Sequence, residues 1–236
     1  MMLRASIGVA LWLGAAFGQS FEVTSVKPNK SGSNDSSTNT TNGSIHAENV
    51  SLKQLIFRAY GVSGYSLTGP DWLGDDKFDI AAKQPGGAAQ DQMRAMLRSL
   101  LAERFGLVAH FEPKSLSGYA LIPGKKPPTL HEKPANAGVN THSGGGSLKA
   151  TNVSMADLAG LLSRQLDQPV QDQTGLPGVC DISLEWSPDG KTDAAAGRPS
   201  SIFTAIQEQL GLKLQPQRIT VDVLVIDHIK RAPTEN

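Results

Sequence analysis

The sequence predicts an α+β fold built from two related units, each with the order β-α-β-β-α-β-β and with mixed or antiparallel sheets. One stretch occurs twice, opening at Ser44 and at Ser147, and the offset of 103 residues superposes an Asn-Val-Ser motif. Such self-similarity sets the architecture. Each copy then runs into apolar residues at helical spacing, and short alternating segments follow. Short connections in place of long crossovers favour mixed or antiparallel pairing.

The first residues have the pattern of a targeting signal. Arg4 precedes an apolar run over 5–16, and small residues follow at 16–18. This pattern predicts a signal peptide over 1–18, with cleavage before Gln19. The run is shorter than the roughly 20 residues that cross a bilayer. We therefore expect an exported chain, periplasmic or extracellular, with no membrane span in its mature part.

The first α+β unit is predicted over 19–122. Residues 21–27 alternate between apolar and polar types, as in a half-buried strand. The segment near 29–43 is almost entirely polar and is expected to be a flexible loop. Ser51 is predicted to cap the next helix, with Gln54 at the capping-box spacing.

The second half of this unit contains the clearest helical pattern of the chain. Apolar residues recur at the spacing of one buried helix face: Met93, Met96, Leu97, Leu100 and Leu101. Gly106 is placed to end this helix in a left-handed cap. The runs 107–111 and 118–122 are then expected to form two hairpin strands around Pro113.

A Pro-, Gly- and Asn-rich stretch over 123–146 is predicted to be a linker, and a second α+β unit is predicted over 147–236. Ser154 should cap its first helix, with Asp157 three residues on. Asp181 matches Asp79 of the first unit, and two closing strands are expected at 212–214 and 221–226.

Composition excludes one class of partner. The chain has 22 basic and 22 acidic residues, hence no net charge, and lacks the basic footprint of nucleic-acid binding proteins. Cys180 is the only cysteine, so it forms no internal disulfide. A small buried hydrophobe is the favoured role for it.

No catalytic, metal or cofactor set is assembled by motif. His131-Glu132 begins like a zinc-protease helix, but Ala135 stands where the second histidine is needed. No Gly-x-Ser-x-Gly elbow occurs. Asp79 and Asp181 could act as a glycosidase pair if the two copies faced each other. Hydrogen bonding to a turn is the favoured role for both carboxylates.

Trp72 and Trp186 are the candidate ligand-binding residues. Both follow turn-rich or strand-end segments, where an aromatic ring can stack on a sugar, a peptide or a partner surface. The alternative, which is favoured, is a partly buried ring that closes a small core.

The chain resembles a duplicated family of exported proteins from Acidobacteria, of the Solibacter type. Matching pieces span nearly the whole mature chain: Phe21-Glu22-Val23, Gly69-Pro70-Asp71-Trp72, Phe78-Asp79-Ile80, Leu100 to Phe105, Asp172 to Leu176, Leu184-Glu185-Trp186, Gln209 to Leu214 and Val225 to His228. Gln173 and Cys180 depart from the family pattern. The resemblance implies no established activity, cofactor or catalytic residue. Similar domains stand behind membrane zinc-peptidase sensors, which implies a sensing or binding role outside the cytoplasm.

These observations lead to a non-enzymatic, exported binding or interaction protein, with a protein, peptide or glycan of the cell envelope as its partner. The alternative is a secreted hydrolase with a site between the two repeats. A structural envelope protein is a third hypothesis. No cofactor is expected for the leading hypothesis.

Overall fold

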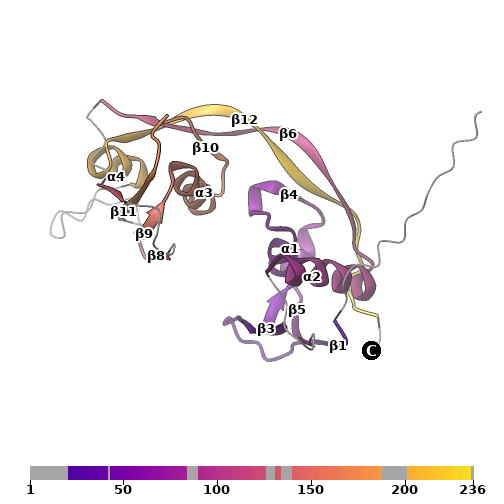
Figure 1. Ribbon diagram of the computed structural model, residues 1–236. Coiled ribbons are helices and arrows are strands. Elements are labelled where there is room, and N and C mark those ends of the chain that lie inside the picture. Colours follow the sequence, from indigo (N-terminus) through magenta and orange to yellow (C-terminus); the bar gives the residue numbers. More distant parts are fainter. Residues whose placement is uncertain are drawn as a thin grey trace, which may run out of the picture. The chain divides into compact units, whose positions relative to one another are not determined.

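The computed structural model of the chain describes residues 21–41, 43–83, 90–125, 131–133, 140–187 and 201–234. The predicted signal peptide over 1–18 lies outside these residues. The α+β prediction is confirmed (Figure 1). The helices are α1 (Leu52–Tyr60), α2 (Gln90–Phe105), α3 (Met155–Leu166) and α4 (Ile202–Gln209), with short 3-10 helices η1 (Gly64–Ser66) and η2 (Asp71–Gly74).

Two antiparallel sheets have the same internal order, one from each copy of the repeat. The first has the order β1-β5-β3-β2, and the second has the order β7-β11-β9-β8. Their strands are β1 (Val23–Pro28), β2 (Ser37–Thr41), β3 (Ser44–Ser51), β5 (Lys77–Lys83), β7 (His131–Lys133), β8 (Asn140–Gly144), β9 (Ser147–Val153) and β11 (Val179–Glu185). Because α1 follows β3 and α3 follows β9, the two copies share topology as well as sequence.

A third sheet mixes strands from both copies, in the order β10-β6-β12-β4. Its long central strands, β6 (Val108–Pro123) and β12 (Leu212–His228), lie side by side (Figure 1). The short strand β4 (Leu67–Thr68) of the first copy pairs in parallel with β12 of the second. The short strand β10 (Val170–Asp172) of the second copy pairs in parallel with β6 of the first. The copies therefore exchange strand partners reciprocally.

The predicted hairpins at 107–111 with 118–122, and the separate strands at 212–214 and 221–226, are wrong. Each pair is one continuous strand, β6 or β12. Pro113 and Pro216 lie outside the stretches that pair with β10 and β4, where one strand edge has no described partner. A residue without an N–H is tolerated at such an edge.

Two compact units divide the chain differently from the predicted ranges 19–122 and 147–236. One comprises residues up to 62, 69–109 and those from 226 onward, and the other comprises 63–68 and 110–225. The boundary falls inside β6 and β12. The expected linker over 123–146 also contributes β7 and β8 to the second copy's sheet. Strand exchange is the physical reason, since β6, which follows the first copy's α2, pairs with the second copy's β10, and β12 pairs with the first copy's β4.

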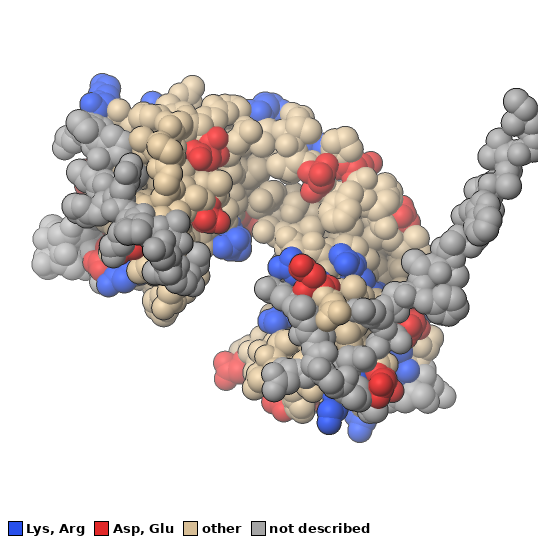
Figure 2. Space-filling view, in the orientation of Figure 1, with Lys and Arg blue, Asp and Glu red and all other residues tan. Residues whose placement is uncertain are grey.

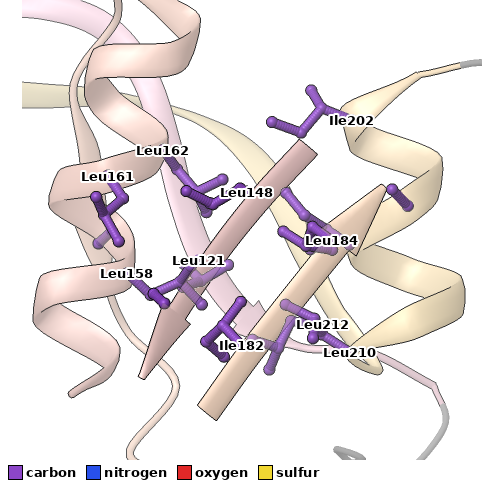
Figure 3. Packing of buried hydrophobic residues seen from close by; sticks show 14 of the residues in the cluster. Leu121, Leu148, Leu158, Leu161, Leu162, Ile182, Leu184, Ile202, Leu210 and Leu212 are labelled. Carbon is purple, nitrogen blue, oxygen red and sulfur yellow. The ribbon is translucent and has the colours of Figure 1, made fainter. Parts of the chain in front are cut away.

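Apolar faces of α3 and α4 form the core of the second compact unit with β9 and β11 (Figure 3). Leu158 and Leu162 of α3 are fully buried against Leu148 and Leu184 of these strands. Leu121, at the end of β6, is fully buried in the same cluster. Cys180 is 3% exposed, which confirms the prediction of a buried cysteine.

The core of the first compact unit lies under α1 and α2. All five apolar residues of the predicted α2 face are buried. Phe105 packs edge-on against Phe78 of β5, with ring centroids 5.2 Å apart. Gly106 has φ +59° and ends α2 as predicted.

Charges of both signs are interspersed on the face shown in Figure 2. In the described part of the chain, no helix has the length and apolar character that a bilayer crossing requires.

Candidate functional site

Each copy carries the same β-bulge at the end of its first repeat strand. In the first copy two residues, the second being Asn49, stand opposite the single residue Asp79. In the second copy Asn152 stands opposite Asp181 in the same way. The asparagines have φ of 56° and 57°, in the left-handed region that asparagine tolerates better than most residues. The Asn-Val-Ser motif is thus the sequence signature of a bulge followed by a helix cap.

The two matching aspartates hold these bulges together. Asp79 Oδ1 accepts the Asn49 N–H at 2.9 Å, and Asp181 Oδ1 accepts the Asn152 N–H at 3.1 Å. The favoured prediction, hydrogen bonding to a turn, is therefore confirmed for both carboxylates. They belong to different compact units. Their matching sequence positions follow from this shared structural role.

The first copy adds a polar segment to its bulge. The Asn49 amide donates to the carbonyls of Ser33 and Asp35, each at 2.7 Å, and Asn29 Nδ2 donates to Asp79 Oδ1 at 2.7 Å. Ser31 contributes to a series of local bonds along the same segment. Part of the segment predicted as a flexible loop near 29–43 has regular structure instead: Ser37–Thr41 forms β2, and Asn29, Ser33 and Asp35 are hydrogen-bonded to the bulge. Side-chain hydrogen bonds there replace the missing apolar contacts.

The Asp79 carboxylate responds to these donors. The hydrogen bond from the Asn29 side chain, and then that from the Asn49 backbone, hold the pKa of Asp79 below its usual value. Protonation of Asp79 would weaken both bonds, because they favour the charged carboxylate. A lowered folded-state pKa stabilises the fold above the unfolded-state pKa, and this stability is lost as the pH falls through the folded-state pKa.

We therefore expect Asp79→Asn to lower the free energy of unfolding by about 1.5 kcal/mol at pH 7. The difference from the wild type should shrink as the pH falls below about 4, where the wild-type carboxyl is also neutralised. Urea unfolding between pH 7 and pH 2.5 measures both effects. The exposed Asp222 serves as the control, and Asp222→Asn at this surface position should change the free energy of unfolding by no more than about 0.5 kcal/mol. A pH-independent deficit for Asp79→Asn would contradict this role.

A polar hollow of about 420 Å³ lies over the bulge of the first copy. Three carboxylates line it, those of Asp35, Glu48 and Asp79, together with asparagine and serine side chains. Among the described residues, no group of three or more His, Cys, Asp or Glu side chains is arranged to hold a metal ion. With its carboxylates, this hollow favours neutral or cationic groups.

A second hollow, the α1–β2 groove, lies between helix α1 and the start of β2. It has a volume of about 480 Å³, within the usual range of ligand sites. Its polar rim consists of Ser36, Thr38, Gln54 and Arg58, and its apolar lining consists of Val50, Leu55 and Phe57. Both hollows are bordered by Ser36. The groove combines an apolar lining with a few polar groups, as binding sites commonly do.

The orientation of Gln54 is fixed by its capping role. Its Oε1 accepts the backbone N–H of Ser51 at 2.8 Å, which completes the capping box predicted from sequence. The amide nitrogen must then point the other way, and it lies 3.4 Å from Ser36 Oγ across the groove. The groove therefore receives the donor end of this side chain.

Several residues that line the groove are specific to the first copy, although the helices α1 and α3 are equivalent. Their buried positions match at the offset of 103, with Leu55 corresponding to Leu158. The remaining positions differ: Lys53, Gln54, Phe57 and Arg58 of α1 correspond to Ala156, Asp157, Gly160 and Leu161 of α3, and Arg58 is exposed where Leu161 is buried. Asp157 closes the second capping box equally well. Neither the cap nor the core therefore requires the amide, the ring or the cations of α1.

Basic side chains lie on α1 and on α2 beside the end of α1. The Lys53 ammonium lies 5.7 Å from the centroid of the Phe57 ring, and the Arg98 guanidinium of α2 lies 5.8 Å from the ring of Tyr60 at the end of α1. Within the described ranges, Lys53, Arg58 and Arg98 form no ion pair with an acidic side chain. These cations are available to a ligand.

The two predicted ligand-binding tryptophans have different settings. Trp186 is 5% exposed and belongs to the core of the second compact unit. Trp72 is half-buried, and the guanidinium of Arg231 lies 5.7 Å from its ring centroid. Arg231 also pairs with Asp75 and Asp76. Neither tryptophan lines the α1–β2 groove.

The groove was missed from the sequence, because the serines of 29–43 resembled those of a disordered loop and the charges of α1 resembled an ordinary solvated helix face. The usable signal is the contrast between the copies at positions where α1 and α3 face outward.

Comparison with known proteins yields one family. A family model described as "Protein of unknown function (DUF3738)" matches residues 53–229, which include α1 and the equivalent elements of the second copy. No curated protein and no solved structure matches the chain.

Proposed function

Since the chain belongs to DUF3738, a family of unknown function, we propose its role from its own geometry: it binds a ligand outside the cytoplasm and does not transform it. The observation that carries the proposal is the contrast between α1 and α3. The buried face is kept in both helices, while Gln54, Phe57 and Arg58 at the groove have no counterpart of the same type in α3. Because the equivalent helix α3 folds without these side chains, we assign them to ligand recognition.

The residues that a hydrolase would have used have other roles. Asp79 and Asp181 hold the bulges, and Ser51 and Ser154 cap α1 and α3. These roles account for the matching carboxylates and serines of the two copies without any reaction. Binding is thus the better-supported proposal, and hydrolysis at a site between the repeats is its alternative.

Export is part of the same proposal. The apolar run before Gln19 supports it, and so does the resemblance to exported acidobacterial proteins and to the domains behind membrane zinc-peptidase sensors. A mature chain recovered from outside the cytoplasm should begin at Gln19, which mass spectrometry of the intact protein measures.

Arrays of random peptides and of glycans test the binding proposal. The wild-type protein should retain a reproducible set of probes, and the double variant Lys53→Ala/Arg58→Leu, which gives α1 the residues of α3, should lose them. Mass spectrometry of the eluted probes should show them intact. Identical retention by the two proteins, no retention on either array, or cleaved probes would each contradict the proposal.

A further inference from the structure

The polar groups at the α1–β2 groove share one property: all can donate hydrogen bonds. Arg58 carries only donors, the Gln54 amide nitrogen keeps one hydrogen beyond the one that it donates to Ser36 Oγ at 3.4 Å, and the hydroxyls of Ser36 and Thr38 can donate as well. None of the described residues that line the groove is acidic. A ligand group that satisfies these donors must itself be an acceptor, and a carboxylate beside a guanidinium forms the stronger, charge-assisted bonds.

The basic side chains on α1 and beside its end also favour a negatively charged ligand group. Lys53 stands beside Phe57 on α1, and Arg94 and Arg98 of α2 are exposed near the end of that helix. The neighbouring hollow carries the carboxylates of Asp35 and Glu48, and it meets the groove at Ser36. A long run of acidic residues would be repelled there, so the geometry fits an isolated negative charge.

The strand that borders the groove can accept a peptide. β2 is the last strand in the order β1-β5-β3-β2, and among described strands it pairs only with β3. Its side chains are mostly exposed. The other edge of such a strand presents a row of backbone N–H and C=O groups. An extended peptide can add to that row as a further strand, with its side chains directed into adjoining pockets.

We infer that the α1–β2 groove binds an extended peptide that adds to the edge of β2 and places a single carboxylate against Arg58 and Gln54. This inference rests on the proposed binding function and specifies its ligand. The apolar lining formed by Val50, Leu55 and Phe57 takes the hydrocarbon part of the residue that bears the carboxylate, or of its neighbour. The carboxylate is that of an acidic side chain or of the peptide C-terminus.

The experiment is a matched peptide array followed by fluorescence anisotropy. Random decapeptides are printed as free acids and as C-terminal amides, and each retained peptide is remade with Asn or Gln in place of its acidic residues. We expect retained peptides to carry one essential carboxylate. Its neutralisation should weaken binding at least about 10-fold, and the two printed forms distinguish a side-chain carboxylate from a terminal one. Affinity should also fall as salt is raised.

Arg58→Gln tests the protein side of the contact and should weaken the same peptides at least about 10-fold. The matched control is Arg164→Gln, because Arg164 is the exposed arginine in the last turn of the equivalent helix α3. That variant should bind like the wild type. Equal losses in both variants would overturn the inference, since they would reflect general attraction to positive charge.

Phe57→Ala separates the inference from the proposed function. If neutral peptides or glycans bind, and Phe57→Ala abolishes their binding, the groove is a binding site but the inferred carboxylate peptide is wrong. If retained probes are insensitive to Phe57→Ala and to Arg58→Gln, the groove is not the binding site, and both the inference and the proposed function are overturned. If no peptide is retained in either printed form, the inference is also overturned.

Discussion

Gly118→Ala should lower the free energy of unfolding by about 3 kcal/mol, the upper part of the range for overpacking. A Cβ at this position would lie within 2.7 Å of Pro169 Cγ and still closer to the Pro169 carbonyl oxygen. That oxygen accepts the Tyr119 N–H at 2.9 Å, beside the parallel pairing of β6 with β10. The backbone at Gly118 cannot move away from Pro169 without breaking the contact between β6 of the first copy and β10 of the second.

Urea unfolding of the full chain measures this loss. Gly74→Ala is the matched control, because a Cβ at Gly74 meets no atom within 4 Å. It should change stability by no more than about 0.5 kcal/mol, as surface substitutions usually do. If Gly118→Ala were equally benign, β6 would not make the close approach to Pro169 that the strand exchange requires.

Leu121→Ala should cost about 3 kcal/mol, because a fully buried leucine is replaced by a smaller residue and a cavity is left behind. Leu121 lies on β6, the strand that follows the first copy's helix α2. Its side chain nevertheless packs in the core of the second compact unit, which also contains Leu158 and Trp186. The loss should therefore appear in the unfolding of the second copy's core.

Tryptophan fluorescence reports that core directly. Outside residues 1–18 the chain has only Trp72 and Trp186, so Trp72→Phe leaves Trp186 as the single reporter. In this background Leu121→Ala should move the Trp186 transition to lower urea concentration. Ile122→Ala, at the half-buried neighbouring position whose side chain points to the opposite face of the strand, should have a smaller effect. A Trp186 transition that Leu121→Ala leaves unmoved would contradict the exchange.

Local features of both copies could be predicted from sequence because neighbouring residues determine them. Ser51 and Ser154 precede partners three residues on, and the structure forms both capping boxes. The α2 face followed from apolar spacing, and Gly106 from its position after that face. The bulges themselves were not predicted; the sequence showed only the repeated Asn-Val-Ser motif and the matching aspartates.

The strand exchange could not be predicted for a physical reason. The copies are similar, and β4 and β10 are only two and three residues long, so local pattern cannot say which long strand each one pairs with. Pro113 suggested a turn, since proline interrupts strands that are paired on both edges. Only the tertiary structure reveals that it lies where one edge has no described partner.

The groove required a different comparison. Residues that match between the copies are those that folding requires. Phe57 and Arg58 become candidates for binding only because α1 and α3 differ at these two positions. The donor orientation of Gln54 depends on its bond to Ser51, which three-dimensional structure alone reveals.

Hydrogen exchange with and without the tightest array peptide tests the central claim, that the first copy's own surface is where a ligand is held. Protection should rise at residues 37–41, on the edge strand β2, and at residues 52–58 of α1, while the equivalent residues 155–161 of α3 should be unchanged. Protection confined to the second copy, or centred on the bulge aspartates with no change along β2 and α1, would contradict it.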